Sequence, residues 1–274
     1  MNAVAQFPTY PDTFYGMGLI NLVQRQTLRT LFQQSVEKIL TEGCRAGFNL
    51  WDSVFNDDGA GSAFLFETYT GSGMTDHMAL STPPASMSYS TNWLALSQVA
   101  HAMHYSGAPL GQLNEGGKVY STLVDSGDFC QNSSSLYGDL LNAGLHVHIY
   151  SSNMDPILGP PTSEAGIMAM MASAGLTESF VAAPRELWSD VVGLNGYSQC
   201  FKTTRGARFC YTTVRNAGHE QPAFQPRAGA DMTYRFFNDI AFAAEKNPAM
   251  PQGPQCSGTP PFAGSADCQC PSTA

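Results

Sequence analysis

The chain has 274 residues, with 13 lysines and arginines against 22 aspartates and glutamates, so its formal net charge is −9 at pH 7. Nucleic-acid affinity is carried largely by cationic side chains that neutralise phosphates, so this acidic excess argues against a nucleic-acid partner. No apolar stretch approaches the roughly 20 residues that a bilayer-spanning helix needs, and we therefore expect no membrane span.

The sequence gives two conflicting indications of cellular compartment. Residues 1–8 lack the basic start and apolar core of a signal peptide. Seven cysteines, a glycosylation sequon at Asn132 and a charged fraction of only 13% are instead typical of an exported protein in an oxidising compartment. Two interpretations follow: a cytosolic chain with incidental features, or a chain whose true beginning is missing.

Residues 14–111 are predicted to be mostly helical, with polar turns between the helices. Apolar residues recur at helical spacing over residues 18–32. We predict a second helix over 33–41 and a third over 93–104. The stretch 57–92 is rich in Gly, Ser, Thr and Pro, which predicts an irregular connection.

The pattern changes at residue 145. A short β-prone run over 145–150 ends in a Ser/Asn loop. His146 and His148 fall on the same face of this strand, and we expect hydrogen-bonded packing roles for both. Two prolines at 160 and 161 then predict the start of a helix.

The remaining elements complete half of a sheet domain. Residues 191–214 predict two strands around a turn at 204–207, and 226–246 predict a closing amphipathic helix. The order of strand, loop, helix, hairpin, loop and helix is typical of the second half of an α/β sheet domain. In such domains, working residues lie on loops beyond the carboxyl ends of strands.

Two loop residues stand out as catalytic candidates. Asp155 follows the first predicted strand and His219 follows the last one. α/β hydrolases present their triad in the chain order Ser, Asp or Glu, then His, each on a loop after its strand. Viewed as isolated residues, an aspartate after a strand is more often a turn former or helix cap, and a histidine after Ala-Gly is more often an ordinary loop residue.

The sequence around these two residues resembles that of a known family. Residues 150–155 read Tyr-Ser-Ser-Asn-Met-Asp, and residues 213–226 read Thr-Val-Arg-Asn-Ala-Gly-His-Glu-Gln-Pro-Ala-Phe-Gln-Pro. They are similar to the aspartate and histidine motifs of the serine carboxypeptidases. Residues 231–237 resemble the helix that follows in that family, and residues 10–20 resemble its Tyr…Gly-Leu-Ile segment. Residues 117–120 and 192–197 are similar to the vitellogenic-like branch.

The resemblance implies a fold, a reaction and a domain layout. The fold would be an α/β-hydrolase fold, present in part. Asp155 would be the triad aspartate and His219 the general base in the release of C-terminal amino acids from a peptide substrate through an acyl-enzyme. Residues 1–115 would hold the start of the fragment and the helical cap, 116–246 the C-terminal half of the core, and 247–274 a tail. A secreted or lysosomal/vacuolar protein is implied.

One departure from the family limits this assignment. The family's nucleophile lies in Gly-Glu-Ser-Tyr-Ala-Gly, and no Gly-x-Ser-x-Gly occurs in this chain. We therefore expect the chain to be the C-terminal half of the enzyme, with the missing half as its partner, and to be nearly inert alone. Two alternatives stay open: a non-catalytic binding or regulatory module, or a carboxypeptidase-like acyltransferase.

Glu220, the cysteines and the C-terminal tail give three further predictions. Glu220 either influences the preferred C-terminal residue of the substrate or points to solvent. Cys200 and Cys210 lie at equal distances from the predicted turn, so they form either a cross-strand disulfide or two buried thiols. The tail is predicted to be disordered or held by disulfides, and its cysteines are too few for a zinc site. We expect no metal and no cofactor.

Overall fold

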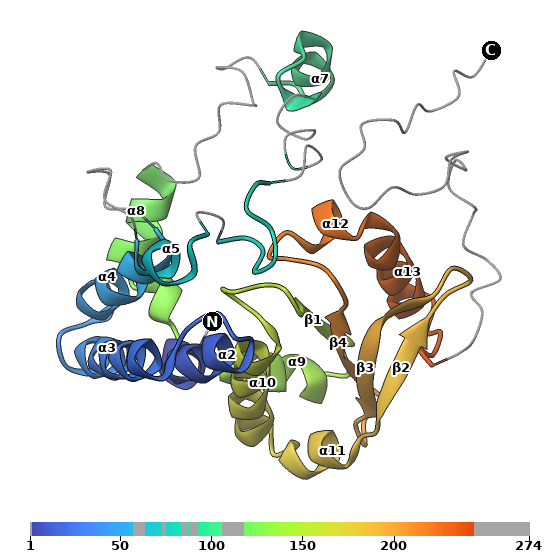
Figure 1. The fold of residues 1–274 in the computed structure, drawn as a ribbon. Coiled ribbons are helices and arrows are strands. Elements are labelled where there is room, and N and C mark those ends of the chain that lie inside the picture. Colours follow the sequence, from blue (N-terminus) through green and yellow to red (C-terminus); the bar gives the residue numbers. More distant parts are fainter. Residues whose placement is uncertain are drawn as a thin grey trace.

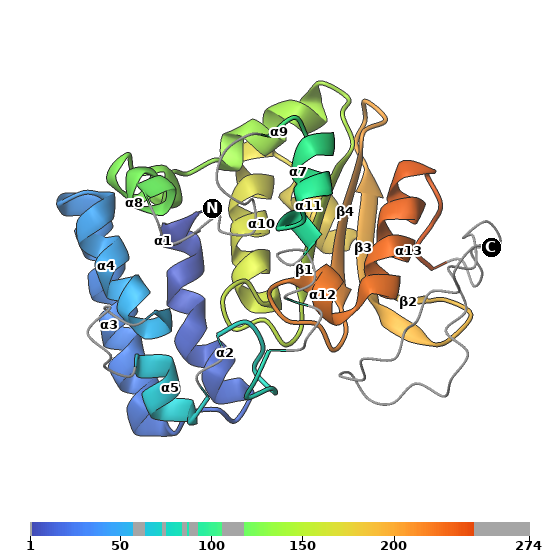
Figure 2. The same ribbon diagram turned by 90° about the horizontal axis from the view of Figure 1, so that it is seen from above.

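The computed structural model describes residues 2–56, 64–72, 75–83, 87, 93–105 and 118–243. A helical region built from the first part of the chain lies beside a four-stranded sheet built from the second part (Figure 1). Helices cover both faces of the sheet, which makes this second region a three-layer α/β/α unit (Figure 2).

The sheet has the strand order β1-β4-β3-β2. Strand β1 (Val147–Ser152) pairs in parallel with β4 (Arg208–Val214), while β3 (Leu194–Lys202) pairs antiparallel with both β4 and β2 (Arg185–Ser189). Every residue of β4 is buried, because this strand is internal and has helices on both faces. The residues that follow β1 and β4 therefore emerge side by side at one edge of the sheet.

Alternate residues of β4 enter two different cores, as the pleat of a strand requires. Phe209 and Tyr211 pack with α9 (Ser134–Asn142), α10 (Pro160–Ala174) and α11 (Thr177–Ala182). On the other face, Cys210 and Val214 pack beneath α12 (Gln221–Phe224) and α13 (Pro226–Phe237).

An aromatic core holds the helical region together. Its buried members are Phe7, Tyr10, Phe14, Phe32, Phe48, Trp51, Phe55 and Phe66. They come from α3 (Leu22–Thr41), from α4 (Cys44–Phe55) and from short helices around these two. The other elements are α1 (Ala3–Gln6), η1 (Phe7–Thr9), α2 (Tyr10–Gly16), α5 (Leu65–Thr70), α7 (Ser97–Ala102), α8 (Lys118–Asp125) and η4 (Asp128–Cys130). A disulfide joins Cys44 to Cys130.

Two predictions for the helical region were wrong. The helices expected over 18–32 and 33–41 form one continuous helix, α3, because no helix-breaking residue separates them. This helix begins only after Asn21, whose side chain and that of Gln24 form a capping box. The stretch expected to be irregular contains α5, which forms where Phe66 enters the aromatic core.

Other boundaries also differ from expectation. Strand β2 was not predicted, and α13 ends at Phe237 rather than near residue 246. The predicted tail at 247–274, and both predicted domain boundaries at 115 and 246, lie outside the residues that the structure describes. None of the described helices combines the length and the apolar composition that a bilayer-spanning segment requires.

Candidate active site

The parallel pairing of β1 and β4 continues beyond the two strands. The backbone N–H groups of Asn153 and Met154 donate to the carbonyls of Val214 and Ala217, both at 3.0 Å. In addition, the Asn153 side-chain oxygen accepts a hydrogen bond of 2.7 Å from the backbone N–H of Asn216. These bonds hold the loop after β1 against the loop after β4.

This loop pairing brings Asp155 and His219 into contact. His219 Nδ1 lies 3.1 Å from Asp155 Oδ2. The other carboxylate oxygen, Oδ1, accepts hydrogen bonds from the backbone N–H groups of Ile157 at 2.7 Å and Leu158 at 3.0 Å. The Asp155 side chain is only 5% exposed, whereas that of His219 is 35% exposed. A buried and fixed carboxylate thus orients an accessible imidazole.

The electrostatics of the site make His219 a stronger base. Its hydrogen bond with Asp155 raises the pKa of His219 above the ordinary value, although burial acts in the opposite direction. The negative charges of Asp155, Asp76 and Glu220 raise the pKa further. With Nδ1 engaged by Asp155, Nε2 is the nitrogen that can exchange a proton with a reacting group.

The helical region supports the aspartate loop through Tyr10. The buried Tyr10 hydroxyl donates to the carbonyl of Ile157 at 2.7 Å and accepts from Trp51 Nε1 at 3.2 Å. Burial raises the pKa of Tyr10, so this hydroxyl keeps its proton and its role as a donor. The sequence singled out Tyr10 only within the segment that resembles the family's Tyr…Gly-Leu-Ile sequence, and it gave no signal for this contact.

A second support was also missed in the sequence. Residues 75–83, which we call the strap, lie against both loops. The carbonyl of Asp76 accepts a 2.7 Å hydrogen bond from the backbone N–H of His219, and the N–H of Met78 donates to the carbonyl of Met154 at 2.8 Å. The prediction of an irregular connection contained nothing to indicate these contacts.

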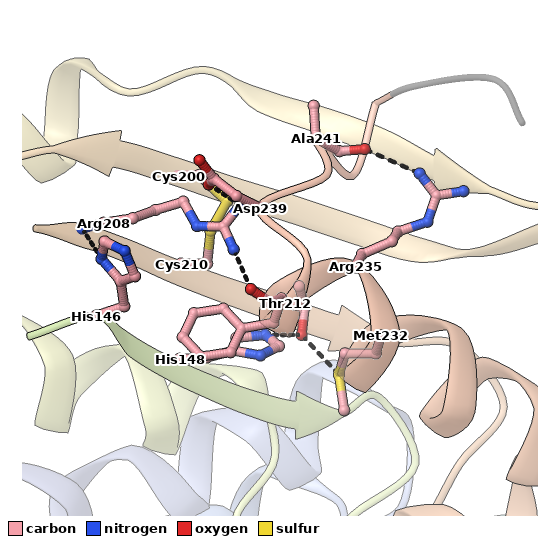
Figure 3. The surroundings of a disulfide bond; sticks show 11 residues. His146, His148, Cys200, Arg208, Cys210, Thr212, Met232, Arg235, Asp239 and Ala241 are labelled. Atoms are coloured by element: carbon pink, nitrogen blue, oxygen red, sulfur yellow. Dashed lines mark hydrogen bonds and ion pairs between the residues drawn. A yellow bond between two sulfur atoms is a disulfide. The ribbon is translucent and has the colours of Figure 1, made fainter. Parts of the chain in front are cut away.

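The other predicted residues lie around or away from this pair. Glu220 is exposed next to His219, at the start of α12. Cys200 and Cys210 form a disulfide between β3 and β4, on the face of the sheet near α13 (Figure 3). The Asn132 side chain is exposed, and its oxygen accepts a hydrogen bond from the backbone N–H of Ser134.

The hydrogen-bonded packing role expected for His148 is confirmed, whereas His146 is exposed, lies just before β1 and only forms a hydrogen bond. His146 Nδ1 accepts from the backbone N–H of Arg208 at 2.8 Å, and His148 Nε2 lies 2.9 Å from Thr212 Oγ1. Neither histidine contributes to the Asp155–His219 site. Across the part of the chain that the structure describes, no group of three or more histidines, cysteines and carboxylates is arranged to hold a metal ion.

Comparison with known proteins gives a consistent result. Residues 1–239 match the family described as serine carboxypeptidase. The chain is 25% identical over 234 residues to a venom serine carboxypeptidase of Apis mellifera, a match that covers 85% of this chain and 48% of the relative. It is 24% identical over 235 residues to the probable serine carboxypeptidase CPVL of Rattus norvegicus, covering 84% and 46%.

A solved structure provides the comparison of fold. The prohormone-processing carboxypeptidase Kex1(delta)p of Saccharomyces cerevisiae superposes with a TM-score of 0.58 at 15% identity, over 88% of this chain and 53% of that one. The prediction of a partial α/β-hydrolase fold is confirmed. The chain spans about half the length of the relatives that it matches.

Proposed function

Because this chain belongs to the serine carboxypeptidase family, we propose that it supplies two of the three triad residues of a serine-type carboxypeptidase. Asp155 is the orienting carboxylate and His219 is the general base and acid. The observation that carries the proposal is the 3.1 Å contact between His219 Nδ1 and Asp155 Oδ2. It places a nearly buried carboxylate behind an imidazole whose side chain remains 35% exposed.

In the proposed reaction His219 first accepts a proton and then donates it, while Asp155 orients its ring. His219 Nε2 takes the proton of a serine hydroxyl as that oxygen attacks the last peptide carbonyl of the substrate. Asp155 stabilises the imidazolium that results. His219 then gives the proton to the leaving amine, which releases the C-terminal amino acid, and water hydrolyses the acyl-enzyme with His219 again as base.

The serine must come from outside this chain, which contains no Gly-x-Ser-x-Gly sequence. We propose that it lies on the nucleophile-bearing half that the family resemblance implies. The two disulfides and the Asn132 sequon support a secreted or lysosomal/vacuolar location, since disulfides persist in oxidising compartments.

The proposal is tested by joining this chain to a relative's segment that carries the nucleophilic serine. The full 274-residue chain is fused behind the nucleophile-bearing part of the honeybee relative, and release of the last residue from N-blocked dipeptides is measured. We expect activity, and we expect Asp155→Asn to reduce kcat by about 10⁴-fold because the imidazole is no longer held in its working tautomer. His219→Gln should reduce it at least as much. An added alcohol distinguishes acyl transfer from hydrolysis.

Matched controls are available on exposed helices. Asp139→Asn in α9 and His101→Gln in α7 make the same chemical changes at exposed positions away from the site. They should leave kcat unchanged. An active fusion in which Asp155→Asn and His219→Gln also keep full activity would contradict the proposal. The unfused chain should show no labelling by a fluorophosphonate.

A further inference from the structure

A single peptide group of the aspartate loop contacts both Asp155 and the helical region. This peptide joins Ile157 to Leu158. Its N–H, which belongs to Leu158, donates a 3.0 Å hydrogen bond to Asp155 Oδ1. Its carbonyl, which belongs to Ile157, accepts a 2.7 Å hydrogen bond from the Tyr10 hydroxyl. A peptide group is planar, so a donor that sets the direction of the carbonyl also sets the direction of the N–H.

The Tyr10 hydroxyl is held in one position. Tyr10 is the first residue of α2 and is completely buried. Its ring lies against those of Phe32 and Phe55 in the aromatic core, at centroid distances of 4.9 and 5.2 Å. Trp51 Nε1 donates to the hydroxyl at 3.2 Å. Because the hydroxyl accepts from the indole, its own proton is directed at the Ile157 carbonyl.

The aspartate loop is too compact to absorb a rotation of this peptide. A second N–H, that of Ile157, donates to the same Asp155 oxygen at 2.7 Å. A Cβ added at Gly159 would lie 2.5 Å from the backbone oxygen of Asp155, so only glycine permits the loop to fold back this closely. The Ile157 side chain packs against the aromatic core. A change in the plane of the peptide is therefore passed on to the carboxylate.

The Asp155 carboxylate extends these contacts to His219. While Oδ1 accepts from the loop, Oδ2 lies 3.1 Å from His219 Nδ1. A series of hydrogen bonds thus runs without interruption from the Trp51 indole, through the Tyr10 hydroxyl and the peptide, to the imidazole. Hydrogen bonds in such a series polarise one another, and burial strengthens each of them.

We propose that Tyr10 is a positioning residue for the Asp155–His219 pair, acting through the peptide group whose carbonyl it bonds. The hydroxyl fixes the plane of this peptide, and the peptide N–H fixes Asp155 Oδ1. The other carboxylate oxygen is thereby held at His219 Nδ1. The catalytic consequence rests on the proposed function, whereas the positioning is a property of this chain alone.

One substitution removes the hydroxyl and keeps the ring, namely Tyr10→Phe. The matched control is Tyr120→Phe in α8, because the Tyr120 hydroxyl bonds at 2.9 Å to Asp52 Oδ1 in α4 instead of to the aspartate loop. The full 274-residue chain, isotopically labelled, is titrated by NMR. The titration reports the pKa of His219, its Nδ1 proton resonance and the amide proton resonance of Leu158. Unfolding midpoints are recorded in parallel.

We expect Tyr10→Phe to move the Leu158 amide proton resonance upfield, because the carbonyl of the same peptide loses its donor. The pKa of His219 should fall toward its ordinary value, because the hydrogen bond with Asp155 is the largest cause of the raised pKa. The Nδ1 proton resonance should move with it. Tyr120→Phe should change the unfolding midpoint only.

Trp51→Phe is an independent second variant. It removes the indole N–H that orients the Tyr10 hydroxyl but keeps the hydroxyl itself, so it should shift the same three quantities in the same direction by a smaller amount. The charged groups that act on His219 are Asp155, Asp76 and Glu220, and none of the substitutions alters them. A shift of the pKa therefore reports geometry. If Tyr10→Phe does not fold, unchanged resonances in Trp51→Phe overturn the inference.

Activity gives a separate measurement. In the active fusion, Tyr10→Phe should lower kcat by about 10-fold with little change in KM, less than the loss of about 100-fold that a misplacement of about 1 Å can cause. If Tyr10→Phe lowers the unfolding midpoint yet leaves the pKa and Nδ1 resonance of His219 unchanged, Tyr10 is only structural and the inference is overturned. The same holds if Tyr120→Phe shifts that pKa equally. An inactive fusion combined with the expected NMR pattern contradicts the proposed function but not the positioning role.

Discussion

His148 shows how one half-buried residue ties stability to pH. Its ring lies on β1 between Phe236 and Phe242, at centroid distances of 4.9 and 5.4 Å, and its Nε2 pairs with Thr212 Oγ1. Burial lowers the pKa of His148 to about 4, and the positive charge of Arg208 acts in the same direction. In the unfolded chain the ordinary histidine pKa of about 6.5 applies.

Between about pH 6.5 and about pH 4 the unfolded chain therefore binds more protons at His148 than the folded chain does. The contribution of this residue to stability is complete above that window and is lost as the pH falls through it. We expect the free energy of unfolding, measured by urea titration, to fall more steeply over this range in the unsubstituted chain than in His148→Gln. Glutamine retains a donor for Thr212 but does not titrate. Equal slopes of unfolding free energy against pH in the unsubstituted chain and in His148→Gln would contradict the prediction. His101→Gln serves as the control.

At the level of residues, the sequence could reveal Asp155 and His219 but not their supports. The two residues stand in motifs that follow strands, and their order matches a triad. The strap and Tyr10 bond to loops that are far away in the sequence: Tyr10 lies 147 residues from its partner Ile157. No local pattern encodes such contacts, since they exist only once the helical region has packed against the sheet.

A buried ion pair anchors α13, the second helix after the histidine loop. Asp231 Oδ2 accepts from Arg235 Nε at 2.8 Å and from Trp188 Nε1 of β2 at 2.7 Å. The guanidinium of Arg235 also donates to the carbonyls of Ser189 and Ala241. The two charged side chains are 1% and 0% exposed. One helix turn is thereby tied to an edge strand and to the segment that follows the helix.

We expect Asp231→Asn to destabilise the protein by about 3–5 kcal/mol, because it leaves the buried guanidinium of Arg235 without its counter-charge. Glu42→Gln is the matched control, since Lys38 and Glu42 form an exposed ion pair with the same i,i+4 spacing in α3. It should cost only about 0.3–0.5 kcal/mol. Urea denaturation measures the free energy of unfolding of both variants. Similar losses of this free energy would show that the buried pair does not anchor α13.

Elements with local pairing were predictable, and elements defined by distant packing were not. The hairpin of β3 and β4 was predicted because its strands flank a short polar turn. Strand β2 was missed because only Trp188 within it is buried, so its sequence carries little strand pattern. Its conformation comes from pairing with β3. Helix α5 likewise depends on Phe66 reaching an aromatic core that residues 7–55 supply.

At the scale of the whole molecule, the Asp155–His219 site lies where the helical region meets the sheet. Tyr10 bonds to the aspartate loop, and the strap bonds to both loops. Nearby, Gln6 and Thr9 of the helical region bond to Thr162 at the start of α10. The geometry of the site therefore depends on the stability of both regions, and among the described residues each region contains one disulfide.

The two disulfides should contribute unequally to that stability. Cys44–Cys130 spans a sequence separation of 86 residues, whereas Cys200–Cys210 spans 10. If the main effect is to restrict the unfolded chain, the longer loop is worth about 4.6 kcal/mol and the shorter about 2.7 kcal/mol. We expect the double variant Cys44→Ala/Cys130→Ala to lose more unfolding free energy than Cys200→Ala/Cys210→Ala in urea titrations under non-reducing conditions. The reverse order would mean that packing of the bond beneath α13 outweighs loop closure.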